Sequence, residues 1–186
     1  IGCELYVAPE SRLEKTTNYS LRDASYHLIL LAKNEQGYKN LLQLITAGYL
    51  EGFYYKPRID KELLAQYCEG LIALSSCSRG EVGHNIFREN LPRAAKVAGD
   101  YKEIMGDGNF FLELQNHKLD YQVKYNSEMV RMGNKLSIPI VAIPSTAGTG
   151  TELAYNAVFT DTKSKKKLGI NTKNNYPKLS ILDETD

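Results

Sequence analysis

Three residues combine a chemically useful side chain with a place in or just after a predicted strand: Glu4, His27 and Cys77. Barrel enzymes gather their functional side chains at strand ends, so side chains in these places are able to contribute to a site. Each also has an ordinary structural interpretation, since a histidine in an apolar strand is commonly a hydrogen-bonded core residue and a cysteine a small buried one. His117 is expected in a polar loop, the alternative being a place at the mouth of a barrel, and the sequence identifies no partner for His84.

A second candidate is the segment Pro144–Glu152 (PSTAGTGTE), which consists largely of glycine, serine and threonine. Its structural alternative is a plain turn. The run Lys163–Lys167 (KSKKK) is expected to be a solvated turn.

The elements that must position these residues alternate along the chain. Nearly continuous apolar segments predict strands at 1–8, 26–32, 70–75, 109–115 and 138–143. Amphipathic spacing predicts helices at 35–49, 61–67, 80–89, 92–105 and 120–136, with Asn34 capping the first. Residues 52–60 are expected to form a loop or an edge hairpin. This alternation predicts an α/β fold with parallel strands, in an open sheet or a closed barrel.

The sequence changes in character after residue 142. Short β-like runs follow at 156–161, 167–171 and 179–182, with no further amphipathic helix. We therefore expect two segments, 1–142 and 143–186.

The composition is that of a soluble globular protein, with 42% hydrophobic and 24% charged residues among 186. Lys+Arg is 23 and Asp+Glu is 22, which argues against broad electrostatic binding of nucleic acid. Three cysteines outside any CxxC spacing favour a reduced, cytoplasmic protein. Neither a membrane span nor a signal peptide is predicted. Because strands begin at Ile1 and run up to the last residues, both ends are expected to lie within a domain.

Five segments, taken together and in order, resemble the PHP domain of bacterial DNA polymerase III alpha subunits over about 140 residues. They are IGCELYVAP at 1–9, YHLILLAKNEQGYKNLLQL at 26–44, YLEGFYYKPRIDKELL at 49–64, EGLIALSSCSRGE at 69–81 and NFFLELQNH at 109–117. The resemblance implies a distorted β/α barrel, here incomplete, that holds Zn²⁺ or Mn²⁺ at its strand ends. In some members these ions activate a water for phosphodiester cleavage.

By the same resemblance, Glu4, His27 and Cys77 match metal-ligand positions of the family. The family's HxH element, a nearby aspartate and its TDH element would precede Ile1. Its closing Asp and His would follow a strand like 138–142, where this chain continues with Ile143 and further residues that carry no ligand. The resemblance therefore implies an incomplete site. We expect a non-catalytic remnant; the alternative is residual metal-dependent phosphoesterase activity.

From about residue 138 onward, the sequence IPIVAIPSTAGTGTELAYNAVFTDTKSKKKLGINTKNNYPKLSILD resembles iron-containing alcohol dehydrogenases. That resemblance implies contacts to NAD(P) from five residues: Ser145, Thr146, Thr149, Asn156 and Lys167. The family's GGGS phosphate-binding segment is replaced by PHP-like sequence, and its metal ligands would follow Asp186. Binding of NAD(P) is a further alternative function, and hydride transfer is not expected.

The two resemblances meet inside a strand, at about 138–144, rather than in a polar linker. We hypothesise a truncated, chimeric reading frame. The expected partners are other segments or subunits of polymerase III, with no membrane partner. A structural or interaction fragment remains an alternative to a protein without function.

Overall fold

The computed structural model describes residues 1–15, 25–115, 119–142, 156–161 and 166–171. The chain forms two compact units, Ile1–Phe110 and Phe111–Asp186, and each is described by itself. Among the described residues, no helix is long and apolar enough to cross a membrane.

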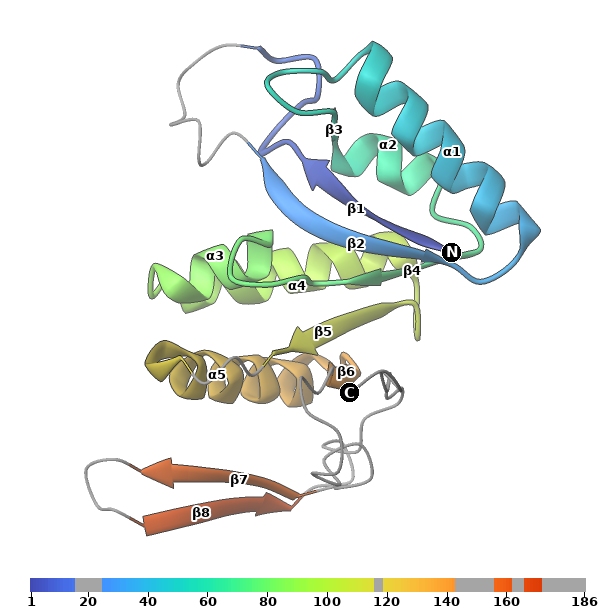
Figure 1. Ribbon diagram of the computed structural model, residues 1–186. Coiled ribbons are helices and arrows are strands. Elements are labelled where there is room, and N and C mark those ends of the chain that lie inside the picture. The colour runs from blue at the N-terminus through green and yellow to red at the C-terminus, as the bar shows by residue number, and fades with distance from the viewer. Residues whose placement is uncertain (16–24, 116–118, 143–155, 162–165, 172–186) are drawn as a thin grey trace. The chain divides into compact units, whose positions relative to one another are not determined.

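The first unit contains a sheet in the order β3-β1-β2-β4 (Figure 1). β1 pairs antiparallel with β2, and β2 pairs antiparallel with β4, while the two-residue edge strand β3 runs parallel to β1. The strands are β1 (Gly2–Val7), β2 (Tyr26–Ala32), β3 (Arg58–Ile59) and β4 (Leu71–Leu74).

The α/β class is confirmed, but the prediction of parallel strands is wrong for β1–β2 and β2–β4. The burial of β2 explains the error. Leu28 and Leu30 are 1% and 0% exposed, whereas Ile29 and Leu31 are only half-buried. The apolar run thus covers one fully buried face and one partly buried face, and such a strand fits an antiparallel sheet equally well.

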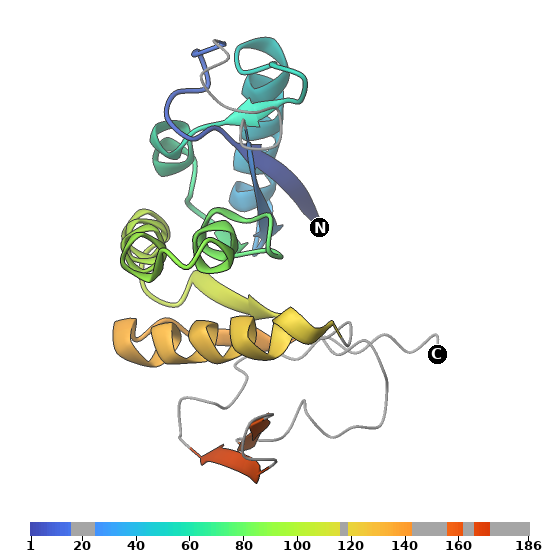
Figure 2. The ribbon, with the colours of Figure 1, turned by 90° about the vertical axis from the view of Figure 1, so that its left-hand side faces the viewer.

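Four helices follow in this unit: α1 (Glu35–Leu50), α2 (Lys61–Gln66), α3 (Glu81–Phe87) and α4 (Leu91–Met105). As predicted, Asn34 caps α1, accepting a 2.9 Å hydrogen bond from the Gly37 amide. Asp60 caps α2 in the same way. α1 packs on β2 and β3, and α3 lies beside α4, as seen almost end-on in Figure 2.

The core of the first unit forms where the helices meet the sheet. Its buried side chains include Leu5, Val7, Leu28, Leu30, Leu44, Ile59, Leu64, Leu74, Val97 and Phe110. Burying one such side chain contributes roughly 1.5–3 kcal/mol. At Gly37 an added Cβ would lie 1.8 Å from the Gly70 carbonyl oxygen, so only glycine lets α1 approach the turn before β4.

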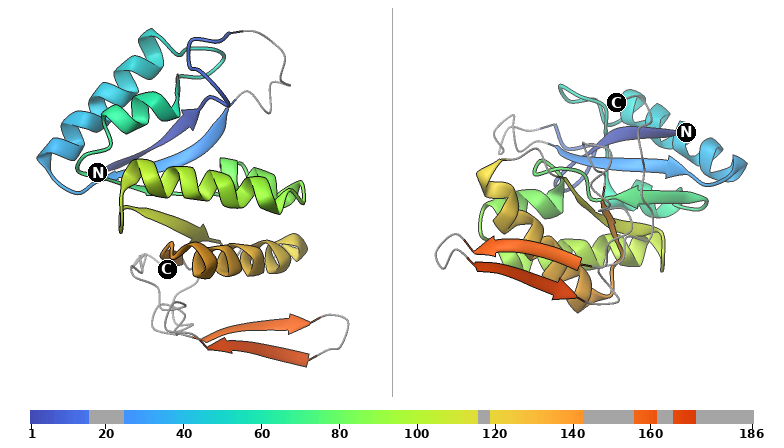
Figure 3. Two further views of the ribbon diagram at one scale, coloured as in Figure 1. Left: turned by 180° about the vertical axis from the view of Figure 1, so that it is seen from behind. Right: turned by 60° about the horizontal axis from the view of Figure 1, so that its bottom comes forward.

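The described secondary structure of the second unit comprises a β-α-β crossover and a hairpin (Figure 3). β5 (Phe110–Leu114), which starts at the boundary of the units, pairs parallel with β6 (Ile140–Ala142) through α5 (Asp120–Leu136). β7 (Asn156–Asp161) and β8 (Lys166–Asn171) pair antiparallel. These strands confirm two of the predicted β-like runs; the third, 179–182, lies outside the described residues.

Candidate functional site

The antiparallel register of β1 and β2 brings Glu4 to His27. Tyr6 stands opposite His27, and Glu4 lies two residues away on the same face of β1. Glu4 Oε2 is 3.1 Å from His27 Nδ1, and the two side chains are 43% and 12% exposed respectively. The Glu4 carboxylate therefore contacts one ring nitrogen, and part of the carboxylate stays exposed to solvent.

Cys77 reaches the same histidine from the segment between β4 and α3. The His27 amide donates a 3.1 Å hydrogen bond to the Arg79 carbonyl, which ties this segment to β2. Gly80 lets the backbone of this segment pass close to Ser75, because an added Cβ at Gly80 would lie 2.1 Å from the Ser75 carbonyl oxygen. Glu4, His27 and Cys77 thus form one cluster, called here the β1–β2 cluster.

His27 changes the acidity of the neighbouring thiol. A hydrogen bond with the imidazole lowers the pKa of Cys77 and outweighs burial, which acts to raise it. The Arg79 amide, 3.4 Å from Sγ, acts in the same direction as the imidazole. The thiolate is the form of cysteine that binds metal and acts as a nucleophile, so this environment favours both kinds of chemistry.

The second nitrogen of the His27 ring, Nε2, is held less well than Nδ1. Nε2 is buried and has no partner with regular hydrogen-bond geometry in the described part of the chain. The edge-to-face contact of the ring with Tyr6, at 5.2 Å between centroids, helps to fix its orientation. A buried nitrogen without a partner is unfavourable unless a ligand or water reaches it.

The cluster fits a metal ion only in part. Imidazole, thiolate and carboxylate are all zinc ligands, and a histidine ligand commonly donates its other ring N–H to a carboxylate, as His27 could to Glu4. Over the described ranges, however, no three His, Cys, Asp or Glu side chains are arranged to hold a metal ion. Glu4 contacts Nδ1, whereas a metal ion would bind Nε2. The position of Glu4 therefore suits a residue that orients the ring.

A second charged cluster was missed by the sequence analysis. The Glu81 side chain is 4% exposed, and Lys61 Nζ lies 2.9 Å from its Oε2. The Tyr101 hydroxyl donates a 3.1 Å hydrogen bond to the same oxygen. Burial, reinforced by Glu81, raises the pKa of Tyr101 well above its usual value. These residues, called here the α2–α4 cluster, are separated by 20 positions at each step, and no local sequence pattern signals such a contact.

The predicted NAD(P) contacts are not brought together by the described structure. Ser145, Thr146 and Thr149 lie outside the described residues, as does His117. Asn156 stands opposite Asn171 in the β7–β8 hairpin, and Lys167 stands opposite Thr160. Their role stays a prediction.

Comparisons with known proteins match both resemblances. The model of the PHP domain family matches residues 1–117, and that of the iron-containing alcohol dehydrogenase family matches residues 112–184. The chain is 46% identical over 141 residues to DNA polymerase III subunit alpha of Treponema pallidum. It is 44% and 43% identical over 142 residues to those of Borreliella burgdorferi and Thermus aquaticus. Each alignment covers 76% of this chain and 12% of the relative, so the chain spans about one eighth of these proteins.

Proposed function

Because the chain belongs to the PHP domain family, we propose that it is a PHP fragment of a polymerase III alpha subunit that binds a divalent metal without turning over phosphodiesters. The observation that carries the proposal is the buried Nε2 of His27, which has no regular hydrogen bond to a described residue, together with the thiol of Cys77, whose pKa the imidazole lowers. An imidazole nitrogen and a thiolate are natural first ligands for Zn²⁺, whereas Mn²⁺ prefers oxygen ligands. Glu4 would hold the ring or add a third ligand.

A bound divalent ion would polarise a phosphoryl oxygen and acidify a water. The residues of this chain would supply the rest: His27 and Cys77 fix the position of the ion, and Glu4 keeps the proton on Nδ1. Phosphoesterase sites with several ions need more ligands than this cluster offers. We therefore expect weak binding of one ion and no turnover.

Zinc titration tests the proposal directly. Competition with a chromophoric chelator should give a zinc affinity that falls at least tenfold in His27→Ala and Cys77→Ser, an effect of about 1.4 kcal/mol or more. Cys68→Ser is the matched control, since Cys68 is likewise a half-buried free cysteine, and it should leave the affinity unchanged. A Cys77→Ser protein that binds zinc as tightly as the native chain would contradict the proposal.

The alternative of a residual phosphoesterase is distinguished by activity on a phosphodiester with a chromophoric leaving group. Turnover that a chelator abolishes, and that His27→Ala removes, would favour this alternative. We expect no turnover above the metal-only reaction.

The iron-containing alcohol dehydrogenase match favours testing NAD(P) as a ligand of the second segment. Saturable binding of NAD⁺ or NADP⁺ that Thr149→Ala weakens would support this function. We expect none, because the phosphate-binding segment of that family is replaced.

We further propose that the two segments meet at 142/143. Amplifying and sequencing the source DNA across the codons for Leu136 to Thr151 tests whether one molecule encodes both segments.

The partners proposed for the first segment are other segments or subunits of polymerase III, because the relatives extend far beyond the region that this chain covers.

A further inference from the structure

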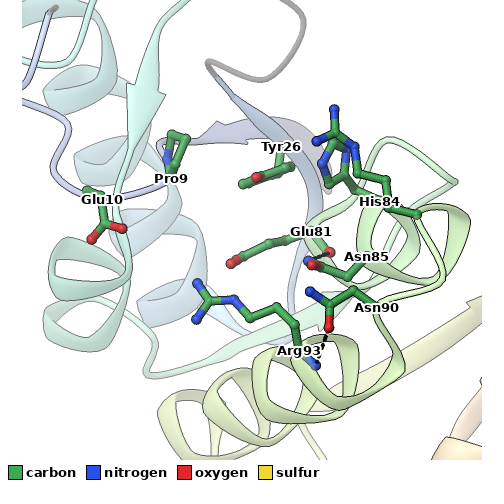
Figure 4. A pocket seen from close by; sticks show the side chains of 9 residues that line it. Pro9, Glu10, Tyr26, Glu81, His84, Asn85, Asn90 and Arg93 are labelled. Atoms are coloured by element: carbon green, nitrogen blue, oxygen red, sulfur yellow. Dashed lines mark hydrogen bonds between the residues drawn. The ribbon is translucent and has the colours of Figure 1, made fainter. Parts of the chain in front are cut away.

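A polar pocket of about 310 Å³ lies in the first unit, apart from the β1–β2 cluster. It is bordered by the segment after β1, the start of β2, and helices α3 and α4 (Figure 4). Tyr26 lines the pocket. Because successive side chains of a strand point to opposite faces, Tyr26 and His27 lie on opposite faces of β2. The pocket is therefore independent of the proposed metal site.

Arg93 gives the pocket a cation that forms no ion pair within the described part of the chain. Its exposed side chain projects from the first turn of α4 into the pocket (Figure 4). The first turn of α4 holds no acidic residue, so the partial positive charge of the helix end adds to that of Arg93. The backbone amide of Arg93 already donates to the Asn90 side chain, which leaves recognition to the guanidinium.

The carboxylates of the pocket do not cancel this positive charge. Glu81 is matched by Lys61 at 2.9 Å and by the Tyr101 hydroxyl. The other carboxylate of the lining, Glu10, is offset by Arg93, and the N-terminal end of α4 adds partial positive charge. A ligand that carries negative charge is favoured, and a guanidinium binds phosphate oxygens through two parallel hydrogen bonds.

The rest of the lining suits a planar ring. Tyr26 is half-buried, with the His84 ring 5.1 Å away and inclined at 64°. Asn85 and Glu10 offer acceptors for amino or hydroxyl groups. The volume is at the lower end of the range for small-molecule sites and exceeds what inorganic phosphate fills. We propose that this pocket binds a phosphate monoester carrying a planar ring, with the chemistry of a nucleoside monophosphate.

Calorimetric titration of the full chain with adenosine monophosphate, in the presence of a chelator, tests this site. We expect saturable binding with a Kd on the order of 1 mM or below. Adenosine and inorganic phosphate should each bind at least fivefold more weakly, and added salt should weaken binding further. Arg93→Ala should weaken binding at least fivefold. The matched control Arg131→Ala, at a site 78% exposed, should leave it unchanged.

Three results would overturn the inference: no saturable binding of adenosine monophosphate, equal binding by Arg93→Ala, or equal binding of adenosine or of inorganic phosphate alone. Arg93→Lys keeps the charge but loses the two-pronged hydrogen bond, so it should bind with intermediate affinity even if the alanine variant folds poorly. His27→Ala should not alter binding of the nucleotide. The metal proposal and this one can therefore fail separately.

Discussion

The first unit holds two clusters of ionisable side chains that differ in how completely their polar groups are satisfied. In the α2–α4 cluster, the 4% exposed Glu81 side chain meets an ammonium and a hydroxyl. In the β1–β2 cluster, the Glu4 side chain is 43% exposed, and the buried Nε2 atom of His27 has no regular hydrogen bond to any residue that the structure describes. Each cluster is built around a glutamate, but one arrangement is closed and the other is open.

This difference distinguishes a cluster that stabilises the fold from a cluster that is available to bind a ligand. A buried carboxylate with internal partners contributes to folding, because removing it leaves those partners without their acceptor. A half-exposed carboxylate adds little to folding, and its solvent-exposed part stays available to a ligand. The four predictions below test this division, from the largest expected effect to the smallest.

The largest effect should come from Glu81→Ala. Removing the carboxylate leaves Lys61 and the Tyr101 hydroxyl without their shared acceptor, and the free energy of unfolding should fall by about 3 kcal/mol. Urea denaturation followed by circular dichroism measures this loss. Glu35→Ala, in a surface pair with Lys39, is the matched control and should change stability by less than about 0.5 kcal/mol. Equal losses in the two variants would contradict the division.

A smaller loss is expected for Tyr101→Phe, which keeps the ring stacked on Phe110 at 5.4 Å but removes one hydrogen bond to Glu81. The cost should be about 1 kcal/mol. The raised pKa of Tyr101 favours the neutral phenol in the folded state. The resulting stability is complete below the unfolded pKa of about 10 and is lost as pH rises above it toward the folded pKa. Above a pH of about 10, the free energy of unfolding of the native protein should therefore fall more steeply than that of Tyr101→Phe.

The open cluster should appear in cysteine reactivity rather than in stability. The pKa of Cys77 is lowered by His27, whereas that of Cys3 is raised by burial and then by Glu4. At neutral pH, iodoacetamide should therefore modify Cys77 severalfold faster than Cys3, as measured by peptide mass spectrometry. His27→Ala should reduce the rate at Cys77. An unchanged rate in that variant would show that the imidazole does not activate the thiol.

The smallest effect should come from Glu4→Ala. Its carboxylate is half-exposed and pairs with His27 alone among the described residues, so the free energy of unfolding should change by less than about 0.5 kcal/mol. The measurement is the same urea denaturation. A loss above about 2 kcal/mol, comparable with that of Glu81→Ala, would remove the distinction between the clusters.

Local signals in the sequence predicted most elements. Asn34 and the apolar spacing behind it placed α1, and α5 begins and ends where the amphipathic pattern does, at Asp120 and Leu136. The direction of the β1–β2 and β2–β4 pairs was not predictable in this way, since an apolar run carries no information on the orientation of its neighbour. Resemblance to a family singled out Glu4, His27 and Cys77, but their ligand roles stay predictions.

The sequence by itself determined the periodicities, the caps and the two family resemblances, because these depend on neighbours within a few positions or on matching segments. Only the tertiary structure decided that Tyr6 faces His27, which brings Glu4 to the ring, and that Lys61, Glu81 and Tyr101 share one oxygen. Strand register and long-range contacts arise from packing of the whole unit. They also set burial, and burial decides whether a carboxylate supports the fold or stays available to a ligand.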